Sequence, residues 1–248
     1  HLASICQSVG IEYADLSEEN IIESNIVFDD ILLLDDAIGK IALFDEKMAK
    51  GAIIGLFANK ADTKDIEIDL GRLHYDDLFY VGTNSTEISD AYKNTPMRAE
   101  LRHDGVAWIL GAGGPMGRMH LQRAIESPTG PKTIIASEVS EVRLDAIRDF
   151  FGQLAIDNNK DLIAINPIVD KENFSSIMSE IYDNGGVDDV EVMVTIPGII
   201  GDTLKFLAKE GVVNIFAGMK RGIKMSIDTW LIIGEKQIRL VGHSGSDL

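Results

Sequence analysis

The feature that most constrains the fold is a short apolar run that leads directly into a glycine-rich turn. Val106–Leu110 is followed at once by Gly111-Ala112-Gly113-Gly114-Pro115-Met116-Gly117, and helix-forming residues come next. A buried strand that passes through glycines into a helix exposes backbone N–H groups and the positive end of the helix dipole. The pattern predicts an α/β fold with a parallel sheet and an anion-binding turn, as in dinucleotide-binding domains.

The spacing of the glycines departs from the usual GxGxxG pattern. It is GxGxxxG when counted from Gly111, and AxGxxG when counted from Ala112. A tight strand-to-helix turn with no ligand is therefore an alternative. The context favours a nucleotide site, because a second apolar run, Thr133–Ser137, ends beside Glu138, where a carboxylate can accept hydrogen bonds from ribose hydroxyls. We expect cofactor contacts from the turn and from the next strand: Gly111, Gly113, Gly114, Pro115, Met116, Gly117, Glu138 and Arg143.

The remaining pattern predicts a complete Rossmann-type doubly wound parallel sheet. Strands are expected at Val106–Leu110, Thr133–Ser137, Leu162–Ile165, Val190–Val194, Val212–Phe216 and Ile238–Gly242, with helices around Met119–Glu126 and Glu141–Leu154. Ligands bind beyond the carboxyl ends of such strands. The loops after the last three strands are predicted to face the nicotinamide, with ordinary turns as the alternative; their candidate residues are Thr195, Ile196, Pro197, Ala217, Gly218, Met219, His243 and Ser244.

An internal repeat predicts two Rossmann-like lobes, of which the first in the chain is incomplete. Phe28-Asp29-Asp30 through Val81-Gly82-Thr83 parallels Val187-Asp188-Asp189 through Val241-Gly242-His243, at an offset of 159 to 160 residues. Before Phe28 there is only a helical run, Leu2–Val9, and a strand candidate, Ile11–Ala14. We therefore predict an incomplete Rossmann-like lobe over residues 1–104 and a dinucleotide-binding Rossmann domain over 105–248. The boundary is expected near Arg102–Gly105, after a helix at Ile88–Leu101, and the chain is expected to be truncated at both ends.

Charge and composition narrow the function classes. The chain has 23 Lys and Arg against 40 Asp and Glu, a net charge of −17, which opposes binding to nucleic acid or to anionic lipid surfaces. No apolar run approaches the ~20 residues of a membrane span, so a soluble, cytoplasmic protein is expected. Cys6 is the only cysteine, so an intrachain disulfide is excluded and no metal site is expected in this chain.

The acidic residue at the strand end favours NAD over NADP. At an effective dielectric constant of ~20 and a separation of ~5 Å, each unit of phosphate charge near Glu138 would cost roughly 3 kcal/mol, about a hundredfold in affinity. Arg143 could offset this by pairing with a phosphate, or it could pack over the adenine or pair with Glu138.

Other catalytic patterns do not match. None of the five tyrosines has a lysine four positions later, which excludes the Tyr–Lys proton transfer of short-chain reductases. Neither GxxxxGK[ST] nor GxSxG occurs. The five histidines are scattered and are interpreted as surface or helix-face residues; His243 is the one at a strand-end loop.

Two segments resemble the medium-chain dehydrogenases of the zinc alcohol and sorbitol dehydrogenase superfamily. They are Trp108–Gly117 with Thr133–Leu144, and Gly211–Gly218 with Val241–Gly245. The resemblance is strongest to the sugar-alcohol branch, which includes sorbitol dehydrogenase and L-sorbose-1-phosphate reductase. It implies NAD(P)-dependent oxidation of a polyol or reduction of a keto sugar or its phosphate, and a homo-oligomer whose dimer edge lies along Ile238–Gly242.

The zinc ligands and the GroES-like catalytic fold of that superfamily have no counterpart in this sequence. Zinc is therefore expected only in a missing catalytic part, the catalytic residues are unknown, and the isolated chain is expected to bind cofactor without turnover. The alternative function is a non-catalytic, NAD(H)-responsive regulatory or assembly module.

Overall fold

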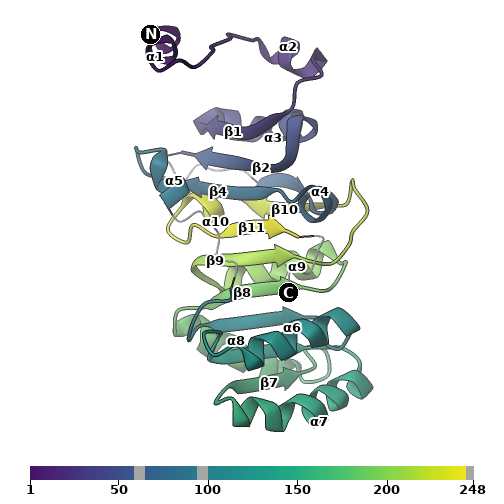
Figure 1. The fold of residues 1–248 in the computed structure, drawn as a ribbon. Coiled ribbons are helices and arrows are strands. Elements are labelled where there is room, and N and C mark those ends of the chain that lie inside the picture. Colours follow the sequence, from purple (N-terminus) through teal and green to yellow (C-terminus); the bar gives the residue numbers. More distant parts are fainter. Residues whose placement is uncertain (59–64, 94–99, 244–248) are drawn as a thin grey trace.

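The computed structural model describes residues 1–58, 65–93 and 100–243. One nine-stranded sheet runs through the molecule in the order β1-β2-β4-β11-β9-β8-β5-β6-β7 (Figure 1). Every neighbouring pair is parallel except β4 with β11. The predicted α/β class with a mostly parallel, Rossmann-type sheet is confirmed. The strands are β1 (Phe28–Leu34), β2 (Met48–Phe57), β4 (Phe79–Thr83), β5 (Val106–Leu110), β6 (Thr133–Ser137), β7 (Asp161–Ile165), β8 (Val187–Val192), β9 (Leu207–Ile215) and β11 (Arg239–Gly242).

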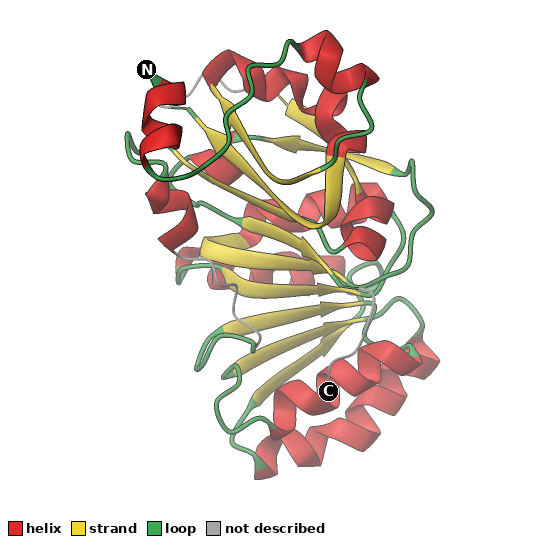
Figure 2. Ribbon diagram, turned by 45° about the horizontal axis from the view of Figure 1, so that its top comes forward, coloured by secondary structure: helices red, strands yellow, loops and turns green. Residues whose placement is uncertain are grey.

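The second lobe has the six strands of a complete doubly wound unit. Numbered along the chain from β5, their order in the sheet is 3-2-1-4-5-6. Its helices lie on both faces of the sheet (Figure 2), which explains why the strands are buried apolar runs. Ile109, Ile134 and Val213 have no exposed surface. The helices are α6 (Pro115–Glu126), α7 (Glu141–Asp157), α8 (Lys171–Asp183) and α9 (Pro197–Thr203), followed by the 3₁₀ turn η3 (Leu204–Phe206) and by α10 (Trp230–Ile233).

The two copies of the internal repeat are related by a local two-fold axis. β3 (Asp65–Asp69) and β10 (Lys224–Asp228), equivalent strands of the two lobes, pair antiparallel in a separate two-stranded sheet. The central pair joins Glu67 to Ser226, which are themselves 159 positions apart. In the main sheet, Tyr80 pairs with Leu240, 160 positions later. Each of these pairs therefore joins equivalent strands of the two repeats. The first lobe packs on the second as one subunit of a symmetric dimer packs on the other.

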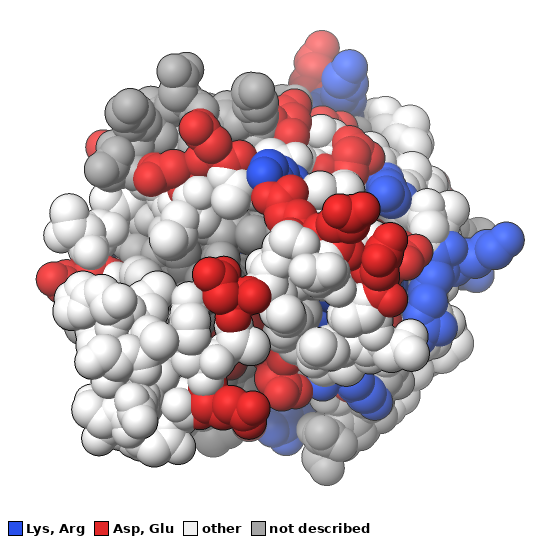
Figure 3. Space-filling model, turned by 90° about the horizontal axis from the view of Figure 1, so that it is seen from above, with Lys and Arg blue, Asp and Glu red and all other residues white. Residues whose placement is uncertain are grey.

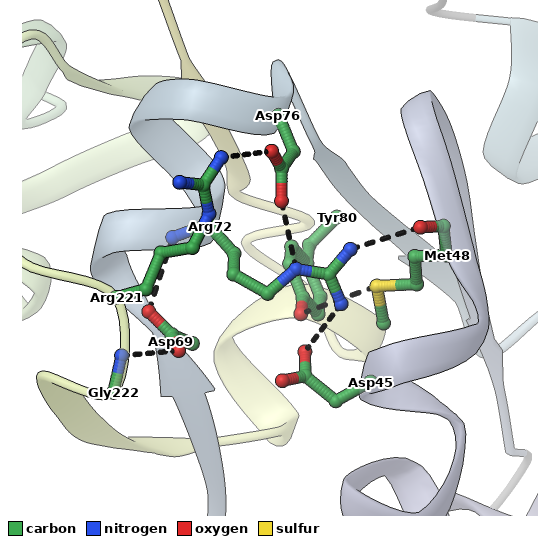
Figure 4. Close-up of polar contacts among 8 residues, drawn as sticks. All are labelled: Asp45, Met48, Asp69, Arg72, Asp76, Tyr80, Arg221 and Gly222. Atoms are coloured by element: carbon green, nitrogen blue, oxygen red, sulfur yellow. Dashed lines mark hydrogen bonds and ion pairs between the residues drawn. The ribbon is translucent and has the colours of Figure 1, made fainter.

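A polar network reinforces this junction (Figure 4). Arg72, on α4 (Leu70–Asp76), donates from Nε to Asp76 at 2.8 Å and from Nη2 to the carbonyl of Met48 at 2.9 Å. Asp76 also accepts from Arg221 of the second lobe at 2.6 Å, which holds the pKa of Asp76 below its ordinary value against the opposing effect of burial. Asp69 accepts from Arg72 N–H and from Gly222 N–H, so its one carboxylate caps α4 and binds the second lobe.

The strand β11 has no free edge. It pairs with β9 on one side and with β4 on the other. The stretch Ile238–Gly242, expected to form the edge of a dimer, is thus occupied within the chain. A homo-oligomer remains a prediction and would require another surface. On the face seen in Figure 3, acidic side chains are more widespread than basic ones, in keeping with the net charge of −17.

Several element predictions need correction. Ile11–Ala14 is not a strand but an exposed loop between α1 (Leu2–Ser8) and α2 (Glu18–Glu23), because no neighbouring strand lies there to pair with it. β8 and β9 begin before the predicted runs and end at Val192 and Ile215. The helix expected at Ile88–Leu101 is described only as α5 (Ser89–Lys93), since residues 94–99 lie outside the described part.

The predicted domain boundary remains a prediction, although contacts across it can be described. Asp189 of β8 accepts from Arg102 N–H at 2.8 Å, and Arg102 Nε lies 2.9 Å from Asp188 Oδ1. The segment leading into β5 is thus fastened to the second lobe. In the described part of the chain, no helix is both long enough and apolar enough to cross a membrane.

Candidate nucleotide-binding site

A cavity of about 900 Å³ opens at the carboxyl ends of β5 and β6 and continues between α8 and α9. Four of the predicted cofactor contacts line it: Gly111, Gly114, Glu138 and Arg143. The parallel sheet explains their convergence, because β5 and β6 are neighbours and end at the same edge. Pro167 and Ile168, after β7, complete the mouth of the cavity.

Glu138 connects the end of β6 to the glycine turn. Its side chain is buried, and one carboxylate oxygen accepts from Gly113 N–H at 3.0 Å. The other oxygen accepts from the N–H groups of Val139 and Ser140, each at 2.9 Å. A carboxylate offers about four lone-pair positions. Three are used here, so Glu138 retains capacity to accept one more hydrogen bond from a ligand in the cavity.

The glycines of the turn have different roles. A Cβ at Gly113 would lie 2.3 Å from Glu138 Oε2, and one at Gly117 would lie 2.7 Å from the carbonyl oxygens of Gly111 and Ala112. Both therefore need glycine for close packing. A Cβ at Gly114 meets nothing within 4 Å. Gly114 begins the helix as its N-cap and lines the cavity, so its missing side chain leaves room for a ligand.

The other predicted cofactor contacts of the glycine turn and of β6 lie close to Glu138 and the glycines. Pro115 is the first residue of α6 and Met116 the second, and neither is among the cavity-lining residues. Arg143, in the first turn of α7, is exposed and lines the cavity, and its Cβ lies beside Gly113. In the part of the chain that the structure describes, its guanidinium forms no ion pair with Glu138 and lies where a ligand in the cavity mouth could contact it.

The loops predicted to face the nicotinamide form a second group. Thr195 and Ile196 are exposed between β8 and α9, and Ala217 N–H donates to the carbonyl of Val192 at 2.8 Å. His243 follows β11, whereas Ser244 lies outside the described residues. β8, β9 and β11 are neighbours in the sheet, so these loops share one edge. None of the loop residues named here lines the cavity.

The first lobe contributes side chains to this second group. His74 of α4 is buried, and its Nδ1 lies 3.2 Å from the carbonyl oxygen of Ile215. A Cβ at Gly218 would lie 3.1 Å from Tyr75 Oη and 3.5 Å from His74 Nε2. The repeat predicted two lobes, but it gave no indication that α4 would pack against the strand ends of the second.

A buried acid-histidine cluster was not found from the sequence. Glu191 of β8 accepts from Asn214 Nδ2 at 2.8 Å, and His120 Nδ1 of α6 lies 3.7 Å from the same carboxylate oxygen. The His120 ring is 4.6 Å from that of Phe216, which in turn lies 6.4 Å from His74. Both histidines lie on helices, His74 buried on α4 and His120 half-buried on α6, and Phe216 lies between them at the ends of β8 and β9.

Burial dominates the electrostatics of this cluster. It raises the pKa of Glu191 to about 7, opposed by the Asn214 hydrogen bond and assisted by the charge of Asp189. It also lowers the pKa of His120, with His243 adding to the effect. His120 Nε2 and Asn214 Oδ1 are buried without a hydrogen-bond partner. One sequence signal could have revealed the cluster: Asp189 and Glu191 are acidic residues within a strand that must be buried on both faces.

The described residues do not bring together a set of metal ligands. In the three described ranges, no group of three or more His, Cys, Asp or Glu side chains could hold a metal ion. The described residues therefore do not fit the zinc site that the resemblance places in a catalytic part.

Comparison with known proteins gives distant relatives. No protein-family model matches the chain. It is 27% identical over 167 residues to mannitol-1-phosphate 5-dehydrogenase of Aliivibrio fischeri (strain ATCC 700601 / ES114), covering 62% of this chain and 39% of that protein. The chain thus spans about two fifths of the length of this curated relative.

Comparison with solved structures gives partial matches that cover somewhat more than half of this chain. One is 2R,3R-butanediol dehydrogenase from Bacillus subtilis, with a TM-score of 0.41 and 20% identity over 58% of this chain and 36% of that one. Another is zinc dependent alcohol dehydrogenase 2 from Streptococcus pneumonia, with a TM-score of 0.42 and 20% identity over 58% of this chain and 37% of that one.

Proposed function

We propose that the second lobe binds NAD(H) and serves as the cofactor-binding part of a medium-chain type oxidoreductase. The observation that carries this proposal is the position of Glu138, whose carboxylate lies against the glycine turn at the mouth of the cavity. The N–H groups at the start of α6 would hold the pyrophosphate, and the remaining acceptor capacity of Glu138 would hold a ribose hydroxyl.

A bound nicotinamide would supply hydride transfer. The chain itself binds and orients the cofactor: Gly114 leaves space for the phosphates, Pro167 and Ile168 offer apolar surface to the adenine, and the negative charge of Glu138 disfavours a 2′-phosphate. We favour NAD over NADP for that reason. Arg143 is the group that could compensate for the charge of a 2′-phosphate.

For the substrate we propose a sugar alcohol or keto sugar, or its phosphate. The support is the resemblance to the sugar-alcohol branch, together with the likeness to an enzyme named for mannitol 1-phosphate. Saturating the chain with NADH and then titrating it with mannitol 1-phosphate or with mannitol tests this. Tighter binding of the phosphate than of mannitol supports a phosphorylated substrate, and heats equal to those of buffer for both remove the support for this substrate class.

Filling the space at Gly114 should weaken nucleotide binding without loss of fold. In Gly114→Val, the side chain enters the cavity where the pyrophosphate would lie, so NADH affinity is expected to fall at least tenfold, or about 1.4 kcal/mol. Gly152→Val is the matched control, because Gly152 lies in α7 with nothing within 4 Å of its Cβ position. Calorimetric titration with NADH measures both variants. Equal NADH affinities of the two variants would show that the glycine turn is not part of the nucleotide site.

A further inference from the structure

The cavity extends well beyond the expected nucleotide contacts. From its mouth it continues along one face of α8, which contributes Lys171, Phe174, Ser175, Ser179 and Tyr182. These residues follow one another at steps of three, one, four and three positions, so they lie along one side of the helix over roughly 16 Å. We call the inner part the side arm; its residues are Trp108, Phe174, Ser175, Ser179, Tyr182, Asp202, Lys205 and Phe206.

A dinucleotide bound as proposed would leave the side arm open. Its adenosine half would lie at Glu138 and Gly114, and its nicotinamide half would extend towards the loops after β8, β9 and β11. Met193 and Val194, directly after β8, line the cavity, whereas the predicted nicotinamide contacts Thr195, Gly218 and His243 do not. The side arm, between α8 and the α9–η3 segment, therefore lies off the path of the cofactor.

Aromatic rings form the walls of the side arm. The Trp108 ring centroid lies 5.7 Å from that of Phe174 and 6.3 Å from that of Phe206, at interplanar angles of 56° and 65°. Trp108 Nε1 already donates to Ser137 Oγ at 2.8 Å, so the indole offers carbon surface. The buried polar atoms that lack hydrogen-bond partners in the described ranges all lie elsewhere. Such walls suit a flat, apolar ring system.

Charged groups lie along the same groove. Lys171 on α8 and Lys205 on η3 are exposed lining residues, and Asp202 on α9 is an exposed acidic residue of the same lining. Lys205 Nζ lies 5.1 Å above the Phe206 ring, which places a positive charge beside the aromatic wall. In a chain of net charge −17, two lysines at an aromatic groove favour an anionic substituent on the ligand.

We propose that the side arm binds a planar aromatic carboxylate of about two fused rings, alongside the nucleotide. The rings would pack against Trp108, Phe174 and Phe206, and the carboxylate would lie near Lys205. This site is separate from the proposed function, because none of the wall residues is an expected cofactor contact.

Calorimetric titration with 2-naphthoate tests the proposal. We expect saturable binding with a dissociation constant on the order of tens of micromolar. Octanoate, which carries the carboxylate without rings, should bind at least tenfold more weakly. The 2-naphthoate affinity should persist when NADH is present at saturation. Absence of binding, equal affinity for octanoate, or displacement by NADH would each overturn the proposal, the last by assigning the probe to the nucleotide site.

A matched pair of variants on α8 locates the site. Ser179→Phe fills the side arm and should weaken 2-naphthoate binding at least tenfold, whereas Ser176→Phe, an exposed position outside the lining, should leave it unchanged. Both variants should bind NADH like the parent chain, which also verifies that they fold. Equal 2-naphthoate affinity in the two variants contradicts the assignment. If NADH fails to bind even the parent chain, the proposed function fails while the 2-naphthoate result still decides this one.

Discussion

Gly242→Ala is expected to prevent the two lobes from packing. A Cβ at Gly242 would lie 1.7 Å from the carbonyl oxygen of Leu73 and 2.6 Å from His74 N. Both are backbone atoms of α4, which cannot move without disturbing the junction of β4 with β11. We expect a loss of more than about 4 kcal/mol in the free energy of unfolding, or no folded protein at all.

Urea denaturation of Gly242→Ala beside Gly152→Ala measures this effect. Gly152 lies in a helix with open space around its Cβ position, so alanine there should raise stability by up to about 1 kcal/mol. A Gly242→Ala protein as stable as the parent would show that α4 does not pack on the end of β11.

Glu191→Gln is expected to make the protein more stable than the parent at neutral and higher pH. The pKa of Glu191 is raised from 4.5 to about 7 by burial, so ionisation of this carboxyl in the folded state is unfavourable. The contribution of the Glu191 carboxyl to the stability of the folded state is complete below pH 4.5 and is lost as the pH rises through about 7. A shift of this size corresponds to roughly 3 kcal/mol. The glutamine keeps an oxygen to accept from Asn214 and carries no charge.

The difference in unfolding free energy between Glu191→Gln and the parent should therefore grow from near zero at pH 4.5 to about 3 kcal/mol at pH 8. Chemical denaturation across this range, with exposed Glu126→Gln as the control, provides the measurement. The lowered pKa of His120 makes stability rise with pH, which is opposite in sign to the effect of Glu191. A difference that stays constant with pH would mean that Glu191 is not buried.

The sequence predicted best those strands that form apolar runs and are buried in the parallel sheet. β5 and β6 match the predicted runs residue for residue, because a parallel strand covered on both faces must be apolar throughout. The contact between Glu138 and the glycine turn has the same origin, since both belong to one strand-turn-helix unit and its neighbour. The repeat predicted that residues 28–83 and 187–243 would be alike, and their equivalent strands β3 and β10 pair with each other.

What the sequence could not provide depends on contacts between distant segments. The pairing of β4 with β11 is antiparallel between two parallel blocks, and nothing in either strand specifies it. Glu191 and His120 are 71 positions apart and meet only when α6 packs over β8. Ile11–Ala14 had a strand-like pattern but no partner, which shows that pattern alone does not make a strand.

The most direct test of the central claim is calorimetric titration of the chain with NADH and with NADPH, in the parent and in Glu138→Ala. We expect the parent to prefer NADH by about a hundredfold. Glu138→Ala should bind NADH more weakly and lose most of this preference, because the carboxylate both accepts from the ribose and repels a 2′-phosphate. Binding of neither nucleotide by the parent chain would contradict it and would leave the glycine turn as a structural feature of the fold.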